Sequence, residues 1–146
     1  MKPEILYRQS FKIKGGDFVN AGQVSIQIKK ILKEIGLNQE IIYRVAICSY
    51  EAEMNAIMYA EKADVELTIT PEEIKIIMTD EGRGIENIEL ALREGYSTAT
   101  NEMREMGFGA GMGLPNMKRN SDLLNISSTP GEGTVVELIT YIKPNG

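Results

Sequence analysis

The spacing of apolar residues divides the first half of this chain into a strand, two helices and the start of a sheet. Residues 5–13 predict a first strand, which a pair of glycines ends. Asp17 can cap a helix that continues to about Ile35, because apolar residues recur there with helical period and Gly36 is a stop signal. Asn38 can cap a second, longer helix.

The second half predicts four strands around a long connection. Apolar and polar residues alternate through 65–70, and residues 74–79 are more apolar, which predicts a half-buried strand followed by a central one. From 81 to 113 the chain is rich in glycine and polar residues, with one short helix expected near 88–93. The remaining pattern predicts a helix and two strands, over 114–122, 124–128 and 134–142.

This order of elements indicates a two-layer α/β (α+β) sandwich. Helices are expected on one face of a mixed, mostly antiparallel sheet. A chain of 146 residues suits one domain, and we expect it to span residues 1–146 because the sequence contains no repeat, low-complexity tract or linker.

Composition excludes several classes of function. The net charge of −5 argues against general binding to nucleic acid or an anionic membrane. No apolar run approaches the ~20 residues that span a bilayer, and no signal-peptide core is present, so we expect a cytoplasmic protein. The single cysteine, Cys48, is expected to be a buried, inert thiol. The basic cluster Lys29, Lys30 and Lys33 is expected to be a solvated helix face.

The chain has no histidine. This absence removes the usual general base, the usual zinc ligand and any phosphohistidine chemistry on this chain. Catalytic triads that depend on histidine are excluded as well. Acid–base chemistry must therefore fall to carboxylates, lysine or tyrosine.

Glu51 and Asn55 are four residues apart on a predicted helix, so their side chains leave the same face, whereas Glu53 points elsewhere. An amide oxygen suits Mg²⁺, and a carboxylate one turn away can orient or deprotonate a hydroxyl that attacks a γ-phosphate. Taken alone, the pair is better explained by a solvent-facing Glu and a helix-interior Asn. The apolar flanks weaken that alternative, because Asn is a poor interior helix former.

Asp80 follows a strand that we expect to be buried. A carboxylate there can accept the exocyclic amine of adenine, and Gly82 and Gly84 let the backbone approach a flat base closely. An ordinary turn after a strand is the alternative. In the glycine turn at 131–133, Thr134 either belongs to a simple hairpin or returns to the floor of the pocket to support the base.

Glycines alternate at four positions between 107 and 113. Alternating glycines allow positive φ angles and expose successive backbone N–H groups to an anion. The last of them, Gly113, opens a helix, whose N-terminus favours phosphate. The segment is neither a Walker loop nor a dinucleotide fingerprint. A flexible loop tip is the alternative, but the regular spacing favours phosphate binding.

These three segments, in this order, resemble the motifs of the GHKL ATPase superfamily, which includes gyrase, Hsp90, histidine kinases and MutL. The Glu-x-x-x-Asn at 51–55 is similar to the N box, Asp80-x-Gly82-x-Gly84 to the G1 box, and the glycine loop to the G2 box with its ATP lid. The resemblance implies the Bergerat fold. In size and in the segments 50–55, 94–99 and 104–119, the chain resembles the small bacterial serine kinases and anti-sigma factors of partner switching. Tyr59, where a histidine often follows the N box in anti-sigma relatives, favours the stressosome switch-kinase branch.

The resemblance implies a protein serine/threonine kinase that uses ATP and Mg²⁺. In this family Glu51 would be the catalytic carboxylate, Asn55 the metal ligand, and Asp80 with Thr134 the adenine site. The implied cofactor-binding residues also include the glycines and their neighbours, Gly82, Gly84, Gly107, Gly109, Gly111, Met112, Gly113 and Leu114.

The resemblance also implies the partners. The substrate would be a STAS-domain antagonist protein, and the released kinase would activate a PP2C-type phosphatase. The alternative is an anti-sigma factor that binds a sigma factor in an ATP-dependent way. A pull-down with ATP present separates the two.

Overall fold

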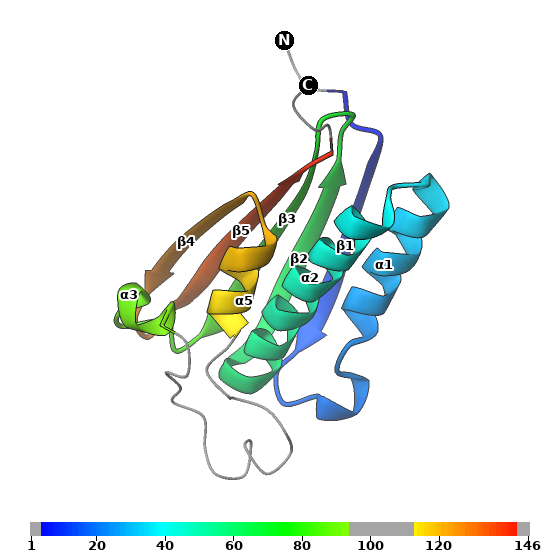
Figure 1. Cartoon of the computed structure of the whole chain (residues 1–146). Coiled ribbons are helices and arrows are strands. Elements are labelled where there is room, and N and C mark those ends of the chain that lie inside the picture. Colours follow the sequence, from blue (N-terminus) through cyan, green and yellow to red (C-terminus); the bar gives the residue numbers. More distant parts are fainter. Residues whose placement is uncertain (1–3, 94–112, 143–146) are drawn as a thin grey trace.

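Five strands form one sheet in the computed structural model, which describes residues 4–93 and 113–142 (Figure 1). Their bounds are β1 (Tyr7–Lys14), β2 (Ala60–Ile69), β3 (Glu73–Gly82), β4 (Leu123–Thr129) and β5 (Gly133–Tyr141). The strand order is β1-β2-β3-β5-β4, so β3 is the central strand, as predicted. Every pairing within this sheet is antiparallel, which makes the sheet more uniform than the mixed one we expected.

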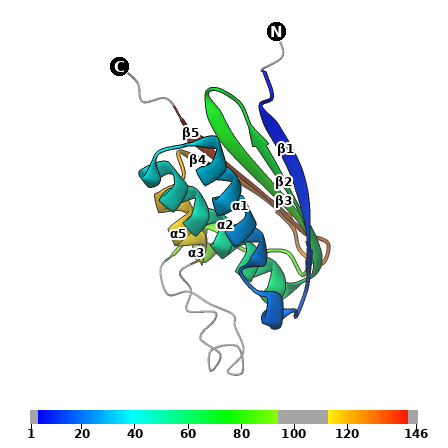
Figure 2. The same cartoon turned by 90° about the vertical axis from the view of Figure 1, so that its right-hand side faces the viewer.

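Helices cover one face of this sheet (Figure 2). The described helical segments are the 3₁₀ turn η1 (Phe18–Asn20), α1 (Gln23–Ile35), α2 (Gln39–Tyr59), α3 (Ile88–Ala91) and α5 (Gly113–Asn120). Helix α2 lies between α1 and α5 (Figure 1). The arrangement confirms the predicted two-layer α/β architecture.

The ends of the long helices follow the predicted capping residues, with one correction. Asn38 Oδ1 accepts the backbone N–H of Ile41 at 2.8 Å and so caps α2. Gly36 ends α1 in the left-handed region, with φ of 90°. Asp17 does not cap α1: its side chain accepts from Asn20 and caps η1 instead. The chain turns again at Gly22, with φ of 95°, and α1 begins only at Gln23.

The core lies between the helices and the covered face of the sheet. On the sheet it contains alternate residues of β2 and β3, such as Leu67, Ile76 and Met78. On the helices it contains Ile28 and Leu32, at the i and i+4 spacing that the sequence predicts. Burial of this apolar surface is the main force that holds the two layers together.

Cys48 belongs to this core and is buried, as predicted. Its thiol is buried and lies 3.7 Å from the backbone carbonyl of Met117, to which it donates. Burial raises the pKa of the thiol to about 12. The thiolate that a nucleophile requires is therefore strongly disfavoured.

The open face of the sheet is polar near its β1 edge. Ion pairs join neighbouring strands there: Arg8 with Glu66 at 3.9 Å, Lys62 with Glu81 at 3.2 Å, and Lys12 with Asp64. All these side chains are exposed enough for solvent to screen them, so we assign them little stability. This face of the sheet is therefore exposed to solvent, whereas the opposite face is covered by the helices (Figure 2).

Candidate functional site

Glu51 and Asn55 lie on one side of α2 and face the first residue of α5. A Cβ atom placed on Gly113 would lie 3.2 Å from Glu51 Oε2 and 3.3 Å from Asn55 Oδ1. Both side chains are half-buried. The structure therefore confirms that the carboxylate and the amide share a helix face, and it brings the start of the post-loop helix against them.

The core fixes α5 in this position. Leu114 and Met117 are buried and pack into the hydrophobic cluster beneath α2. Sequence reasoning assigned Leu114 to the nucleotide, but its side chain faces the core. Any contact of Leu114 with a ligand must therefore come from its backbone.

Asn116 is a site residue that our sequence reasoning missed. Its side chain hydrogen-bonds the Glu51 carboxylate. Its Oδ1 accepts from Arg119 Nη2 at 2.6 Å, which leaves the amide NH₂ as the donor toward Glu51. Helical spacing could have found it, because Asn116 lies three residues after Gly113, close to one turn along α5.

Burial changes the basicity of Glu51. Removal from water raises the pKa of this carboxyl above its usual range, and the hydrogen bond from Asn116 lowers it in part. A raised pKa makes the carboxylate a better proton acceptor than a fully solvated one.

A second polar cluster joins the end of β3 to the start of β5. Asp80 Oδ1 accepts the backbone N–H of Thr134 at 3.1 Å, and Asp80 and Thr134 are paired across the two strands. The Thr134 hydroxyl lies 2.8 Å from Ser128 Oγ, which in turn accepts the backbone N–H of Ile85 at 2.7 Å. The structure thus brings together the two residues expected at the base, and it adds Ser128, for which the sequence carries no signal.

Burial also raises the pKa of Asp80 above its usual range, while the N–H of Thr134 lowers it in part. That hydrogen bond uses Oδ1, and the second oxygen of a carboxylate can accept a further donor. Recognition of an exocyclic amine by Asp80 stays a prediction.

Packing against neighbouring backbone explains why Gly82 and Gly84, which follow Asp80, carry no side chain. A Cβ on Gly82 would lie 2.7 Å from the Tyr59 carbonyl oxygen, where α2 ends. Gly84 has φ of 75°, and its Cβ would lie 2.5 Å from the Thr129 carbonyl oxygen. Neither position tolerates a side chain even without a ligand. The prediction that they let a base approach stays a prediction.

The predicted phosphate-binding loop lies mostly outside the described residues. This holds for Gly107, Gly109, Gly111 and Met112, and only Gly113 of the alternating glycines is described. Its position beside Glu51 and Asn55 places the end of the loop at the predicted catalytic pair.

Glu53 lies on another face of α2, as expected, and its carboxylate makes hydrogen bonds of its own. Its side chain is 2 % exposed, and it accepts three backbone N–H groups at the start of α1. The carboxylate therefore has a structural role, because it caps a neighbouring helix.

Residues 44–144 match the family model described as histidine kinase-, DNA gyrase B- and HSP90-like ATPase. The chain belongs to this ATPase family. The match confirms the superfamily that the three motifs predicted, and a domain of this family uses ATP.

Relatives of this family member include a kinase and several anti-sigma factors. The serine/threonine-protein kinase RsbT of Bacillus subtilis is 29% identical over 131 residues, 87% of this chain and 90% of that protein. The anti-sigma F factor of Caldanaerobacter subterraneus is 36% identical over 100 residues, 65% of this chain and 66% of that protein. That of a Thermoanaerobacter species is 33% identical over 122 residues, 84% of this chain and 78% of that protein. The predicted enzyme class, a protein serine/threonine kinase, is confirmed by the first of these.

Solved structures show the same fold. The chain with RsbU and RsbW domains from Mycobacterium tuberculosis has a TM-score of 0.59 at 16% identity, covering 93% of this chain and 33% of that one. The SiaB–SiaC complex of Pseudomonas aeruginosa contains a chain with a TM-score of 0.57 at 14% identity, covering 94% of this chain and 91% of that one. Among the described residues, no helix is long and apolar enough to cross a membrane.

Proposed function

We propose that this family member is a switch kinase, which phosphorylates a serine or threonine of a STAS-domain antagonist protein and acts in a bacterial partner-switching pathway of the stressosome type. The contact of the Glu51–Asn55 pair with the first residue of α5 carries the proposal. The carboxylate is half-buried, has a raised pKa and lies where the proposed phosphate-binding loop joins its helix. A carboxylate there meets the γ-phosphate end of a nucleotide.

In this proposal Glu51 is the catalytic residue. The hydroxyl oxygen of the substrate attacks the γ-phosphorus of ATP, the bond from that phosphorus to the ADP oxygen breaks, and the hydroxyl proton passes to the Glu51 carboxylate. Little proton transfer is needed before the transition state of phosphoryl transfer, so orientation of the hydroxyl is the larger part of the role. Asn116 serves that role by fixing the carboxylate.

Asn55 is the proposed protein ligand of Mg²⁺. The described residues contain no cluster of three or more Cys, Asp or Glu side chains that could hold a metal alone. One amide oxygen next to one carboxylate fits an ion that keeps several waters and bridges substrate phosphates. When bound, such an ion neutralises charge on the transferred phosphoryl group.

Asp80 and Thr134 are the proposed adenine site, with Gly82 and Gly84 beside them. The end of β3 pairs with Ala60, where α2 ends, nine residues after Glu51. Nine helical residues rise about 13.5 Å, which leaves room for an extended nucleotide between the base site and the catalytic pair. Backbone N–H groups of the loop would then bind the phosphates, from Gly107, Gly109, Gly111, Met112, Gly113 and Leu114.

Partner choice completes the proposal. Phosphorylation of the antagonist lowers its affinity and releases the kinase, which then activates a PP2C-type phosphatase in the cytoplasm. The second candidate is an anti-sigma factor that holds a sigma factor when ATP is bound. The several anti-sigma F factors among the relatives favour it as the alternative.

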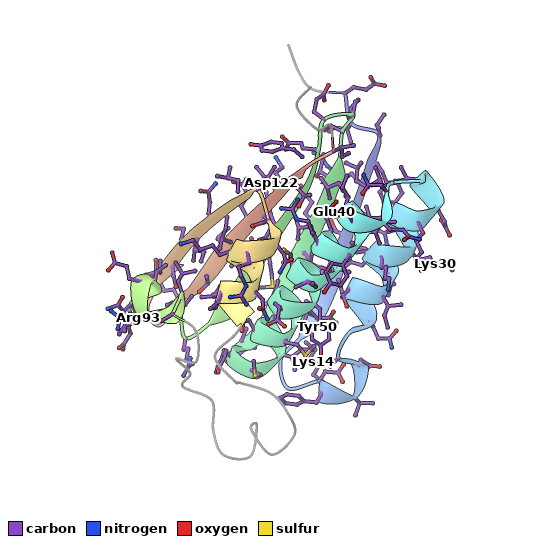
Figure 3. The ribbon with its side chains drawn as sticks, in the orientation of Figure 1. Lys14, Lys30, Glu40, Tyr50, Arg93 and Asp122 are labelled. Carbon is purple, nitrogen blue, oxygen red and sulfur yellow. The ribbon has the colours of Figure 1, made fainter. Side chains whose placement is uncertain are left out.

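The Glu51→Gln variant tests the kinase proposal. We expect it to bind ATP almost normally, as measured by calorimetry, and to phosphorylate a purified STAS-domain protein at least ~100-fold more slowly. Glu40→Gln is the matched control, because Glu40 is exposed in the first turn of the same helix. Figure 3 shows it far along α2 from Tyr50, the residue before Glu51. Equal loss of transfer in both variants would remove Glu51 from the mechanism.

The alternative is tested with the unmutated chain. If it binds ATP and captures a sigma factor with ATP present, but transfers no phosphate to any STAS-domain protein, the anti-sigma function replaces the kinase proposal. Capture of a STAS-domain protein and a phosphatase supports the kinase.

A further inference from the structure

A groove of about 1200 Å³ runs along the outer side of α2. Helix α2 forms its floor, and α1 and α5 form its two walls, which is the order of these helices in Figure 1. Glu51 and Asn116, the catalytic carboxylate and its hydrogen-bond partner, line it too. The groove therefore opens onto the proposed site of phosphoryl transfer. Its exposed lining includes Ile26, Lys29, Lys33, Tyr43 and Tyr50.

Large apolar side chains in this groove face solvent. Ile26 is 59% exposed, Tyr43 65% and Tyr50 41%. They come from two different helices and line one continuous groove. Tyrosines at such a surface bury much area on binding and lose little side-chain entropy, which makes them common anchors of protein interfaces.

The charge of the groove is opposite to that of the chain. The chain carries a net charge of −5, yet the charged side chains that line the groove, among the described residues, are Lys29, Lys33 and Arg119 together with Glu51. Glu51 is committed to the catalytic site. The rest of the groove is therefore cationic, and it favours an acidic partner.

We propose that this groove, lined by Ile26, Lys29, Lys33, Tyr43 and Tyr50 and ending at Glu51, docks an acidic and partly apolar segment of the protein substrate beside its accepting hydroxyl. The inference rests on the proposed kinase function and adds to it where the substrate binds. It also gives Lys29 and Lys33 a role beyond the solvated helix face that the sequence predicts.

The length of the groove sets the length of the docked segment. Tyr43 and Glu51 are eight residues apart on α2, a rise of about 12 Å. An extended peptide covers that distance with about four residues. The acidic and apolar residues of the substrate should thus lie within a few positions of the phosphorylated residue when that segment is extended.

Charge reversal in the groove tests the docking. The probe is a purified STAS-domain protein from the same genome, and its binding is measured by interferometry with a non-hydrolysable ATP analogue, so that no catalysis is needed. We expect Lys29→Glu/Lys33→Glu to weaken binding about tenfold or more and to make it less sensitive to salt. In transfer assays KM for the STAS protein should rise by a similar factor, while kcat and ATP affinity stay unchanged.

Lys30→Glu is the matched control, because Lys30 is the neighbour of Lys29 on α1, is exposed and does not line the groove. In Figure 3 it lies on the side of α1 away from α2. We expect this control to change binding less than about twofold. Tyr43→Ala, which removes an exposed side chain, should weaken binding about fivefold without lowering the melting temperature.

The outcomes separate this inference from the kinase proposal. Equal binding by the Lys29→Glu/Lys33→Glu variant and by Lys30→Glu would overturn the docking groove and leave the kinase intact. A STAS protein that binds through the groove but is never phosphorylated would support the groove and contradict the kinase. A dimer in sedimentation that the double charge reversal dissolves would assign the groove to a second copy of this chain and overturn the inference.

Discussion

The Glu53 carboxylate accepts a hydrogen bond from the backbone N–H of Gly22 at 3.0 Å, across 31 positions of sequence. It also accepts from Val24 at 3.2 Å and from Ser25 at 3.0 Å. Gly22 is the N-cap residue of α1 and has no side chain to cap it. Glu53 thus supplies from α2 the acceptor that an N-cap side chain usually supplies locally, and it complements the positive end of the α1 dipole.

Replacement of Glu53 by Gln should destabilise the fold. The amide keeps one acceptor oxygen but turns an NH₂ group toward backbone donors, and hydrogen bonds to a charged group contribute ~1.5–3 kcal/mol. We expect a loss of about 2 kcal/mol, seen in thermal unfolding as a drop of about 6 °C. Glu34→Gln, at an exposed position of α1, should change the melting temperature very little. Identical melting of both variants would remove the capping role.

Asp80→Asn should lose most ATP affinity. The amide can still accept the N–H of Thr134, so the fold should hold, but its NH₂ then faces the amine of adenine. A lost charge-assisted bond of ~1.5–3 kcal/mol corresponds to about tenfold or more in affinity. Calorimetry with ATP and GTP measures this, with the exposed Asp64→Asn as control. Equal affinity of the unmutated chain for ATP and GTP would remove the adenine assignment.

Asn55→Ala should abolish the dependence of binding and transfer on Mg²⁺. Asn55 faces Gly113 and Glu51 rather than the core, so the fold should remain intact. The measurement is ATP affinity at rising Mg²⁺, together with a melting curve. A variant that keeps full transfer activity would return Asn55 to an ordinary helix position.

Loss of Asn116 should shift the pH dependence of transfer. The side-chain hydrogen bond from Asn116 lowers the pKa of Glu51, so Asn116→Leu should let that pKa rise further. We expect the acidic limb of the kcat profile to move to higher pH, with ATP affinity unchanged. Asn125→Ala on β4, which removes an exposed hydrogen bond to Glu137, should leave the profile in place. An unshifted profile in Asn116→Leu would limit that residue to packing.

Glu51 also links stability to pH. Burial holds its folded-state pKa above the unfolded value, so the folded chain binds more protons between these two values. This contribution to stability is present below the unfolded pKa and is lost as pH rises through the folded one. Glu51→Gln cannot ionise and should therefore melt at a higher temperature than the unmutated chain at neutral pH. The difference should shrink as pH falls toward the usual range of Glu, and a constant difference would contradict the linkage.

Local signals in the sequence predicted most of the fold. Asn38 marks the start of α2 and Gly36 the end of α1, because capping and left-handed turns depend on neighbouring residues alone. The alternation in β2 follows from burial of one face of the sheet, and the more apolar β3 is the central strand, as predicted. The shared face of Glu51 and Asn55 followed from helical period. Asp17 was predicted to cap α1 but caps η1, because a turn at Gly22 separates these two helices.

The contacts that join distant segments were decided by the tertiary structure alone. Periodicity shows that Glu53 leaves another face of α2, but only the packing of α1 against α2 buries it under three N–H donors. In the same way, β5 beside β3 brings Thr134 to Asp80, β4 beside β5 brings Ser128 to Thr134, and α5 brings Asn116 to Glu51. Propensity and spacing act over a few residues, whereas these hydrogen bonds exist only after burial of the core has fixed how the helices and strands meet.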